Sequence, residues 1–166
     1  MIYTDLPAGA TIFVDAGVFI HHFEPNAKFG PASTQFLERI ENQEIHGVTS
    51  THIVSEVAHS LMTIEAMQVF GWKSAGIALR LRNHPTQVQT LKRFRQAVQE
   101  IPLFGLRIAT IDLAWLDAAA AISQQTGLLH NDALIVAVMQ ALGLANLASV
   151  DPDFDRVPGF TRYAPA

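Results

Sequence analysis

The 166-residue sequence contains no cysteine. This absence excludes disulfide bonds, thiolate zinc sites and a cysteine nucleophile, and it fits a reducing compartment. The first fifteen residues also lack a basic region followed by an apolar stretch, so we expect no signal peptide. Together these absences lead us to expect a cytoplasmic protein.

Charged residues are missing from residues 133–150, a stretch long enough to raise the question of a membrane span. Gln140, Gly143 and Asn146 interrupt this stretch, and its longest apolar run, ALIVAVM, is far below the roughly 20 residues that a helix needs to cross a bilayer. We therefore expect a buried helix followed by a buried strand, and no membrane association.

Acidic residues are absent from residues 66–99, although the chain has 15 of them. This segment has a formal charge of +6 and the rest of the chain −10, which together give the net charge of −4. Two interpretations are open: a face that attracts a polyanion, or a solvated helical surface. The six basic residues are Lys73, Arg80, Arg82, Lys92, Arg93 and Arg95.

Strand-like and helix-like patterns alternate along the chain without repeats or long linkers, which predicts one domain over residues 1–166, with a basic helical segment at about 66–99. Ser50 or Thr51 is expected to cap the helix that starts near 51, and Asn131 the last helix. The alternation predicts an α/β fold: a three-layer α/β/α sandwich with a central, mostly parallel sheet. We expect strands at 10–15, 47–50, 106–111, 147–150 and 160–163, and helices at 31–46, 51–64, 72–82, 85–99, 112–126 and 131–142.

Four acidic residues stand in apolar or boundary contexts, where an ionised group is costly. They are Asp15 after TIFV, Glu56 in a largely apolar helix, Asp132 at the start of the charge-free stretch, and Asp151 after LASV. Each alone has a simpler explanation, such as a helix N-terminus for Asp132 or an Asx-turn for Asp151. Because all four occur in such contexts, we favour one shared pocket, in which a divalent cation would balance the repulsion between the carboxylates. Hard oxygen ligands of this kind favour Mg²⁺ or Mn²⁺.

Three aspartates alternate at the end of the last predicted buried strand. An EF-hand loop starting at Asp151 is excluded, because its sixth and twelfth positions hold Arg156 and Arg162 instead of Gly and Glu. We expect Asp151 to be the ligand and Asp153 to be an additional candidate ligand. Asp155 is expected to pair with Arg156 or to cap the backbone.

The order and contexts of these residues resemble the PIN-domain nucleases, and more closely the VapC-type toxins of bacterial toxin–antitoxin pairs. The resemblance covers nearly the whole chain and is carried by FVDAGVFI (13–20), VSEVAHSL (54–61), LLHNDALIVAVMQALG (128–143) and DPDFDRVPGF (151–160). It implies a central parallel sheet, metal-dependent hydrolysis of RNA, an antitoxin on a separate chain and a homodimer. Position by position, it places the acidic site at Asp15, Glu56, Asp132 and Asp151, with Asp153 as an additional member.

The resulting prediction is a Mg²⁺- or Mn²⁺-dependent endoribonuclease, the toxin of a type II toxin–antitoxin pair. A metal-bound water would attack the phosphodiester, and Glu56 or Asp132 would orient or deprotonate that water. The basic segment would hold the RNA backbone, with little reading of sequence. The candidate RNA-binding residues are Arg80, Arg82, Lys92, Arg93 and Arg95.

The chain departs from the family pattern directly after Asp15, where Ala16 and Gly17 replace a hydroxyl residue and an asparagine. This departure leaves a second interpretation open: a catalytically degenerate PIN-like domain that binds RNA or a protein without cleaving RNA. A di-iron centre built on the motif EVAH, residues 56–59, is disfavoured because that class requires a second such motif on another helix, and the sequence has none.

Overall fold

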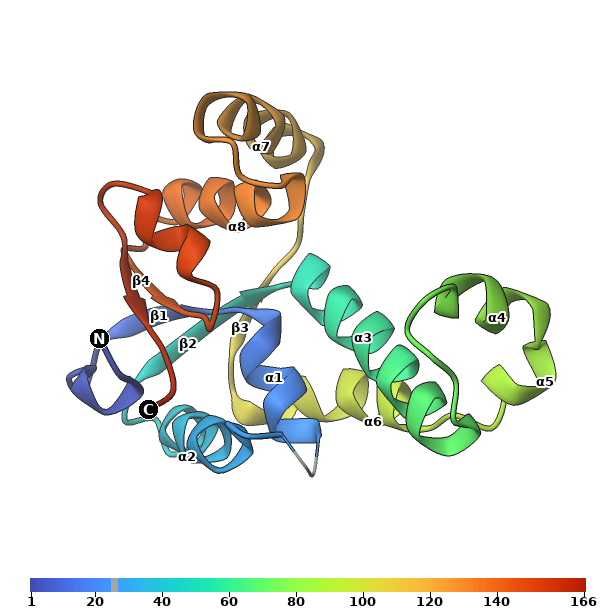
Figure 1. The fold of residues 1–166 in the computed structure, drawn as a ribbon. Coiled ribbons are helices and arrows are strands. Elements are labelled where there is room, and N and C mark those ends of the chain that lie inside the picture. Colours follow the sequence, from blue (N-terminus) through green and yellow to red (C-terminus); the bar gives the residue numbers. More distant parts are fainter. Residues whose placement is uncertain (25–26) are drawn as a thin grey trace.

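The computed structural model describes residues 1–24 and 27–166. Its centre is a five-stranded sheet in the order β3-β2-β1-β4-β5, in which every neighbouring pair is parallel (Figure 1). The predicted α/β fold with a parallel sheet is therefore confirmed. The strands are β1 (Thr11–Val14), β2 (His46–Ser50), β3 (Arg107–Ala109), β4 (Asn146–Ala148) and β5 (Thr161–Tyr163).

Strand β1 lies in the middle of the sheet because its apolar residues can be buried on both faces. Ile12, Phe13 and Val14 are completely buried, as expected for a strand covered by helices on either side. Phe13 lies opposite Val48 in β2 and opposite Leu147 in β4. The chain adds β2 and β3 on one side of β1 and then returns to add β4 and β5 on the other. The carboxyl ends of β1 and β4 thus form a topological switch point, where sites of α/β proteins occur.

Helices cover both faces of the sheet: in Figure 1, α7 and α8 lie on one side, and α1 and α2 lie on the other. Residues 133–139 of helix α8 are buried and apolar, but no helix in the described residues is long and apolar enough to cross a membrane. The α-helices are α1 (Ala16–Phe23), α2 (Gly30–Glu41), α3 (Thr51–Phe70), α4 (Ile77–Asn83), α5 (Pro85–Val88), α6 (Arg93–Glu100), α7 (Leu113–Thr126) and α8 (His130–Ala141). Short 3₁₀ helices are η1 (Tyr3–Asp5), η2 (Ile101–Phe104) and η3 (Pro152–Arg156).

Two helix starts differ in their caps. Ser50 caps α3 as expected, and its hydroxyl accepts a hydrogen bond from the backbone N–H of Ile53 at 3.4 Å. The prediction that Asn131 caps the last helix is wrong. Helix α8 begins one residue earlier, with Leu129 at the N-cap position and no side-chain cap. Asn131 and the neighbouring Asp132 therefore lie in the first helical turn, and their side chains do not cap the N-terminus of the helix.

The second half of α3 projects from the rest of the molecule together with α4 and α5, and α6 leads back to the main core (Figure 1). We call residues 62–99 the arm. The arm has a small core of its own, in which Ala66, Leu81 and Leu91 are buried. Phe94 packs against both this core and the main core, so that the two are continuous. The helix expected at 85–99 is broken into α5 and α6, because the buried carboxylate of Glu65 accepts hydrogen bonds from the backbone at the start of α6.

Candidate active site

Asp15 lies at the carboxyl end of β1 and is the N-cap of α1. Only 9% of its surface is exposed, and both carboxylate oxygens are held. Oδ1 accepts a hydrogen bond from the backbone N–H of Ala16, and Oδ2 accepts one from the hydroxyl of Ser149, each at 2.6 Å. The strand end and the helix start thus fix this carboxylate in one orientation, at the switch point of the sheet.

Ser149 is a site residue that the sequence analysis missed. It follows β4, is completely buried, and joins the ends of β1 and β4 through its hydroxyl. Besides donating to Asp15, this hydroxyl accepts a hydrogen bond from the backbone N–H of Asp151 at 3.1 Å. The available signal was a lone hydroxyl residue in the apolar run LASV, two positions before an aspartate.

The three alternating aspartates have different partners. Asp151 caps η3 by accepting a hydrogen bond from the backbone N–H of Asp153 at 2.8 Å, as in the Asx-turn considered from sequence. The pairing expected for Asp155 is wrong, since Asp155 binds Arg162 through two hydrogen bonds of 2.8 Å. Arg156 instead pairs with Asp153 at 2.8 Å. The reason is the three-residue turn of η3, which brings residues three apart onto the same side.

Asp132 and Glu56 approach this edge from two helices. Asp132 lies in the first turn of α8, and no side-chain cap is formed there. Glu56 lies on α3, with a side chain that is 38% exposed, and His52 Nε2 is 3.7 Å from its Oε2. Burial lowers the pKa of His52, so its ring is neutral near pH 7 and does not form an ion pair with Glu56. Glu56 therefore keeps its negative charge unbalanced by this neighbour.

The acidic side chains act on one another's ionisation. The pKa of Asp15 is raised, chiefly by burial and further by the charges of Asp132 and Asp151, against the lowering effect of the hydrogen bonds from Ser149 and Ala16. Burial, then Asp15 and Asp132, raise the pKa of Glu56. Burial, then Asp151 and Asp153, raise the pKa of Asp132. The fold has therefore brought within electrostatic range the whole set predicted from sequence: Asp15, Glu56, Asp132, Asp151 and Asp153.

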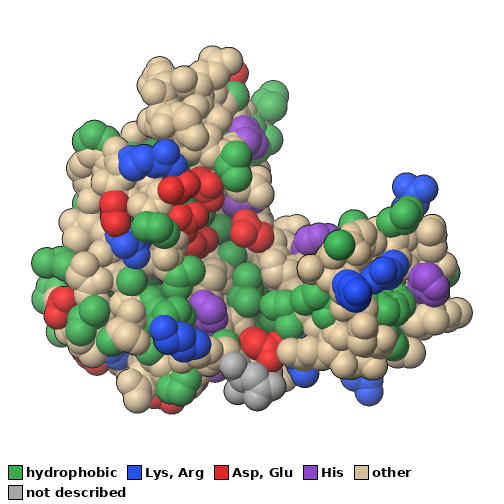
Figure 2. All heavy atoms as spheres, in the orientation of Figure 1, with side chains coloured by type: hydrophobic (Ala, Val, Ile, Leu, Met, Phe, Trp, Pro, Cys, Tyr) green, Lys and Arg blue, Asp and Glu red, His purple; other side chains and the backbone are tan. Residues whose placement is uncertain are grey.

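The acidic side chains gather on one face of the molecule (Figure 2). Figure 2 shows acidic side chains gathered between the region of α8 and η3 and the start of α3. All these elements meet at the carboxyl edge of the sheet, since β1 precedes α1, β2 precedes α3 and β4 precedes η3. Mutual repulsion at such a place is a cost that a bound cation would relieve.

The chemistry of the donors fits a hard divalent cation, because all of them are carboxylate oxygens. In the described part of the chain, however, no three His, Asp or Glu side chains are arranged to hold one metal ion. Carboxylate oxygens of Asp15 and Asp151 already accept hydrogen bonds. A carboxylate oxygen of Asp153 forms an ion pair with Arg156. The ligand set therefore stays a prediction, and metal binding would require side chains such as Asp153 to rotate away from their present partners.

The two residues that depart from the family pattern are tightly enclosed. Ala16 is 2% exposed, and a Cβ atom added at Gly17 would lie 3.1 Å from Cγ2 of Val150. A larger side chain at Gly17 would press against Val150, in the segment that follows β4. The hydroxyl group that contacts Asp15 comes instead from Ser149, on the neighbouring strand end.

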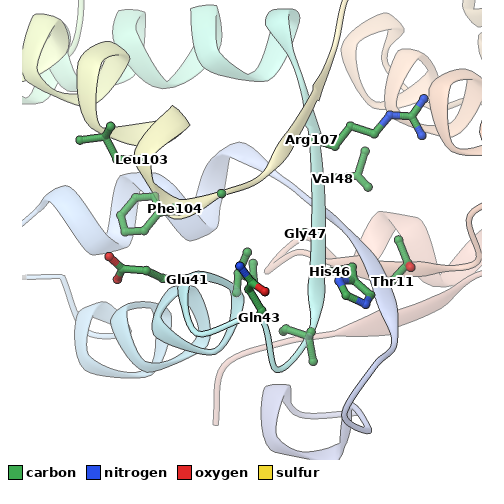
Figure 3. A pocket seen from close by; sticks show the side chains of 12 residues that line it. Thr11, Glu41, Gln43, His46, Gly47, Val48, Leu103, Phe104 and Arg107 are labelled. Atoms are coloured by element: carbon green, nitrogen blue, oxygen red, sulfur yellow. The ribbon is translucent and has the colours of Figure 1, made fainter.

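A pocket of about 540 Å³ lies at the opposite edge of the sheet (Figure 3). Its lining includes Thr11, His46 and Arg107, which are the first residues of β1, β2 and β3. Because the strands are parallel, this pocket is separated from Asp15 by the length of β1. It therefore does not belong to the predicted acidic site.

The fold and the site together describe a class of protein: a three-layer α/β/α domain with clustered carboxylates at the switch point of a parallel sheet. The family model of the PIN domain matches residues 12–159. The chain belongs to the PIN-domain family.

Solved structures with the same fold include VapC toxins and their complexes. Mycobacterium tuberculosis VapC20, described as a sarcin–ricin loop cleaving toxin, matches with a TM-score of 0.61 and 18% identity over 90% of this chain and 96% of that one. A toxin–antitoxin complex from Klebsiella pneumoniae has a TM-score of 0.56 and 18% identity, over 90% and 95%. VapBC2 from Rickettsia felis, bound to a DNA fragment from its promoter, matches with a TM-score of 0.56 and 14% identity over 94% of this chain and 99% of that one. None of the curated proteins compared with the chain matches it significantly.

Proposed function

We propose that this protein is a Mg²⁺- or Mn²⁺-dependent endoribonuclease and the toxin of a type II toxin–antitoxin pair. The observation that carries the proposal is the mutual electrostatic effect of Asp15, Glu56, Asp132 and Asp151 at the switch point of a PIN-domain sheet. A cluster of this kind has no use in folding, because each charge makes the others costlier. It suits a site that takes up cations and a negatively charged substrate together.

The roles of the carboxylates follow from their surroundings. Asp15 is held by Ser149 and by the start of α1, so it is oriented before anything binds. A bound Mg²⁺ or Mn²⁺ ion would supply an activated water and would neutralise charge on the scissile phosphate. The raised pKa values of Glu56 and Asp132 make these two better proton acceptors than ordinary carboxylates. Either could therefore accept the proton of the attacking water, leaving products with a 5′-phosphate and a 3′-hydroxyl.

The proposed partners are a cognate antitoxin on a separate chain and a second copy of this protein. Support for the antitoxin comes from the similar structures, among which are toxin–antitoxin complexes from Klebsiella pneumoniae and Rickettsia felis. The homodimer rests on the family resemblance alone. RNA as the substrate is supported by the excess of basic over acidic residues on the arm, since a polyanion is attracted by such a surface.

A second candidate function is an RNA- or protein-binding module without catalysis. It is favoured by the replacement residues Ala16 and Gly17 and by the absence, within the described residues, of three side chains arranged around one metal position. The two functions differ in turnover: a binding module retains RNA without cleaving it, whatever the metal.

The deciding experiment is cleavage of total RNA by antitoxin-free protein in Mg²⁺, Mn²⁺ or EDTA. The site variant carries Asp15→Asn and Asp132→Asn. The control variant carries Asp117→Asn and Glu41→Gln, which remove the same charge at exposed positions outside the acidic cluster. We expect products that require metal, that persist in the control and that disappear in the site variant. Folded protein that cleaves in none of the three conditions but still retains RNA would favour the binding module instead.

A further inference from the structure

A groove of about 430 Å³ lies on the arm, along α6 and the turn that precedes it. It is formed by two cationic side chains, three amides and a single apolar residue. Cations suit phosphate oxygens, whereas amides can donate to and accept from ribose hydroxyls and base edges. The lining residues are Gln89, Leu91, Lys92, Arg95, Gln96 and Gln99.

The two cations of the groove have no competing partners. Lys92 and Arg95 are exposed, and neither side chain makes a hydrogen bond or ion pair within residues 1–24 and 27–166. Arg93 differs from them, because its Nη1 donates to Glu24 at 3.1 Å and to Gln68 at 2.6 Å. Of the RNA-binding candidates from sequence, Arg93 thus fastens the arm to the core, and the groove presents its neighbours to solvent.

Two acidic residues near the groove, Glu65 and Glu100, already accept hydrogen bonds from other groups. Glu65 accepts hydrogen bonds from the backbone N–H groups of Lys92 and Arg93, at 2.9 to 3.2 Å. Glu100 accepts one from Gln96 at 2.9 Å. Because Glu65 occupies the N-terminus of α6, an anion in the groove would be bound by side chains and not by the helix terminus. The positive charge of Lys92 and Arg95 is therefore available to a ligand.

We propose that this groove binds the phosphate backbone of the substrate RNA, separately from the acidic site. The inference rests on the proposed function, which supplies RNA as the substrate. Without metal, the clustered carboxylates repel a polyanion, so attraction must come from another surface. A protein partner is disfavoured because interface centres need large apolar or aromatic anchors, and the only apolar lining residue, Leu91, is 5% exposed.

The test is binding of a short single-stranded RNA, labelled for fluorescence anisotropy, in EDTA and over a series of salt concentrations. EDTA separates binding from cleavage. The groove variant carries Lys92→Ala and Arg95→Ala. The control carries Lys73→Ala and Arg107→Ala, which remove the same charge at exposed positions outside the groove. We expect the groove variant to lose about tenfold or more in affinity at low salt, and its log–log salt slope to fall by about 1.4, as expected for two phosphate contacts on a single strand.

The control should keep the parent's salt slope. A neutral variant, Gln89→Ala with Gln99→Ala, should weaken binding without changing the slope, because amides displace no counterions. Equal losses in the groove and control variants would overturn the proposal, since only net charge would then matter. It would equally be overturned if the groove variant bound RNA like the parent but no longer bound the antitoxin. Metal-dependent cleavage by the parent, measured separately, shows whether the proposed function stands when the groove fails.

Discussion

Replacing Ser149 with alanine tests whether the link between β1 and β4 supports both folding and the site. The variant loses the hydrogen bond to the carboxylate of Asp15 and the one from the backbone of Asp151. A bond to an ionised group contributes about 1.5–3 kcal/mol and a neutral one about 0.5–1.5 kcal/mol. We expect the free energy of unfolding to fall by about 2–4 kcal/mol in EDTA at pH 8. This is a large part of the roughly 5–15 kcal/mol by which a typical domain is stable.

A second buried serine provides the matched control. Ser33 in α2 is also completely buried, but its hydroxyl, which lies near the phenol of Tyr3, has no contact of hydrogen-bond geometry among the described residues. Ser33→Ala removes the same atom without breaking a bond, and alanine is the better helix former by about 0.5 kcal/mol. Urea unfolding followed by tryptophan fluorescence should therefore show a small change for Ser33→Ala and a large one for Ser149→Ala. Equal changes would refute the reasoning.

The effect of Ser149→Ala should also depend on pH. Asp15 already has a raised pKa in the folded state, so the fold loses stability as pH rises from the ordinary carboxyl range through that raised value. The hydroxyl of Ser149 opposes this shift, because it donates to the ionised form. Without it, the pKa of Asp15 rises further. The variant should therefore be hurt less below pH 4 than at pH 8, and the acidic limb of its cleavage profile should move to higher pH. A destabilisation that is the same at both pH values would contradict this account.

Two further substitutions test the charge cluster and the packing of the sheet. Asp132→Asn should raise the free energy of unfolding in EDTA at pH 7, and with it the melting temperature, by less than about 1 kcal/mol because the group is half-exposed. This gain should vanish below pH 4, and cleavage should fall by roughly 100-fold or more. Unchanged melting at pH 7 would argue against repulsion at this residue. Gly47→Ala should cost about 1–3 kcal/mol in urea unfolding, because its Cβ would collide with Leu106 and lie 2.9 Å from two carbons of Ile40; full stability would show that the strand can shift there.

The sheet was predictable because burial of a parallel strand leaves a mark in the sequence. The runs ending at Asp15 and Asp151 are short, apolar and closed by a carboxylate, and the structure makes them the adjacent strands β1 and β4. Local rules also gave the cap at Ser50. They failed where a distant side chain decides the outcome: α6 begins where it does because Glu65, 27 residues before Lys92, accepts hydrogen bonds from its backbone.

The residues of the candidate site also divide into those that local sequence predicts and those that depend on distant parts of the chain. Four carboxylates were found because charge in an apolar context is costly and therefore conspicuous in sequence. Ser149 was missed because a buried serine is common, and its importance depends on the carboxylate that the fold places opposite it. The partner of Asp155 was misassigned because Arg156 is adjacent in sequence, whereas Arg162 is brought close by β5. Pairings set by tertiary structure leave no local pattern.

The distribution of charge in the molecule connects these observations. Acidic groups stand at the switch point, where burial and neighbouring carboxylates raise the pKa values of Asp15, Glu56 and Asp132. Basic groups are concentrated on the arm, where Lys92 and Arg95 have no side-chain partner among residues 1–24 and 27–166, while Glu65 and Arg93 secure the helix that carries them. A protein that only needed to fold would pair these two sets with each other. Under the proposed function, the arm would attract the RNA, and the acidic site would admit the same polyanion only with a cation bound.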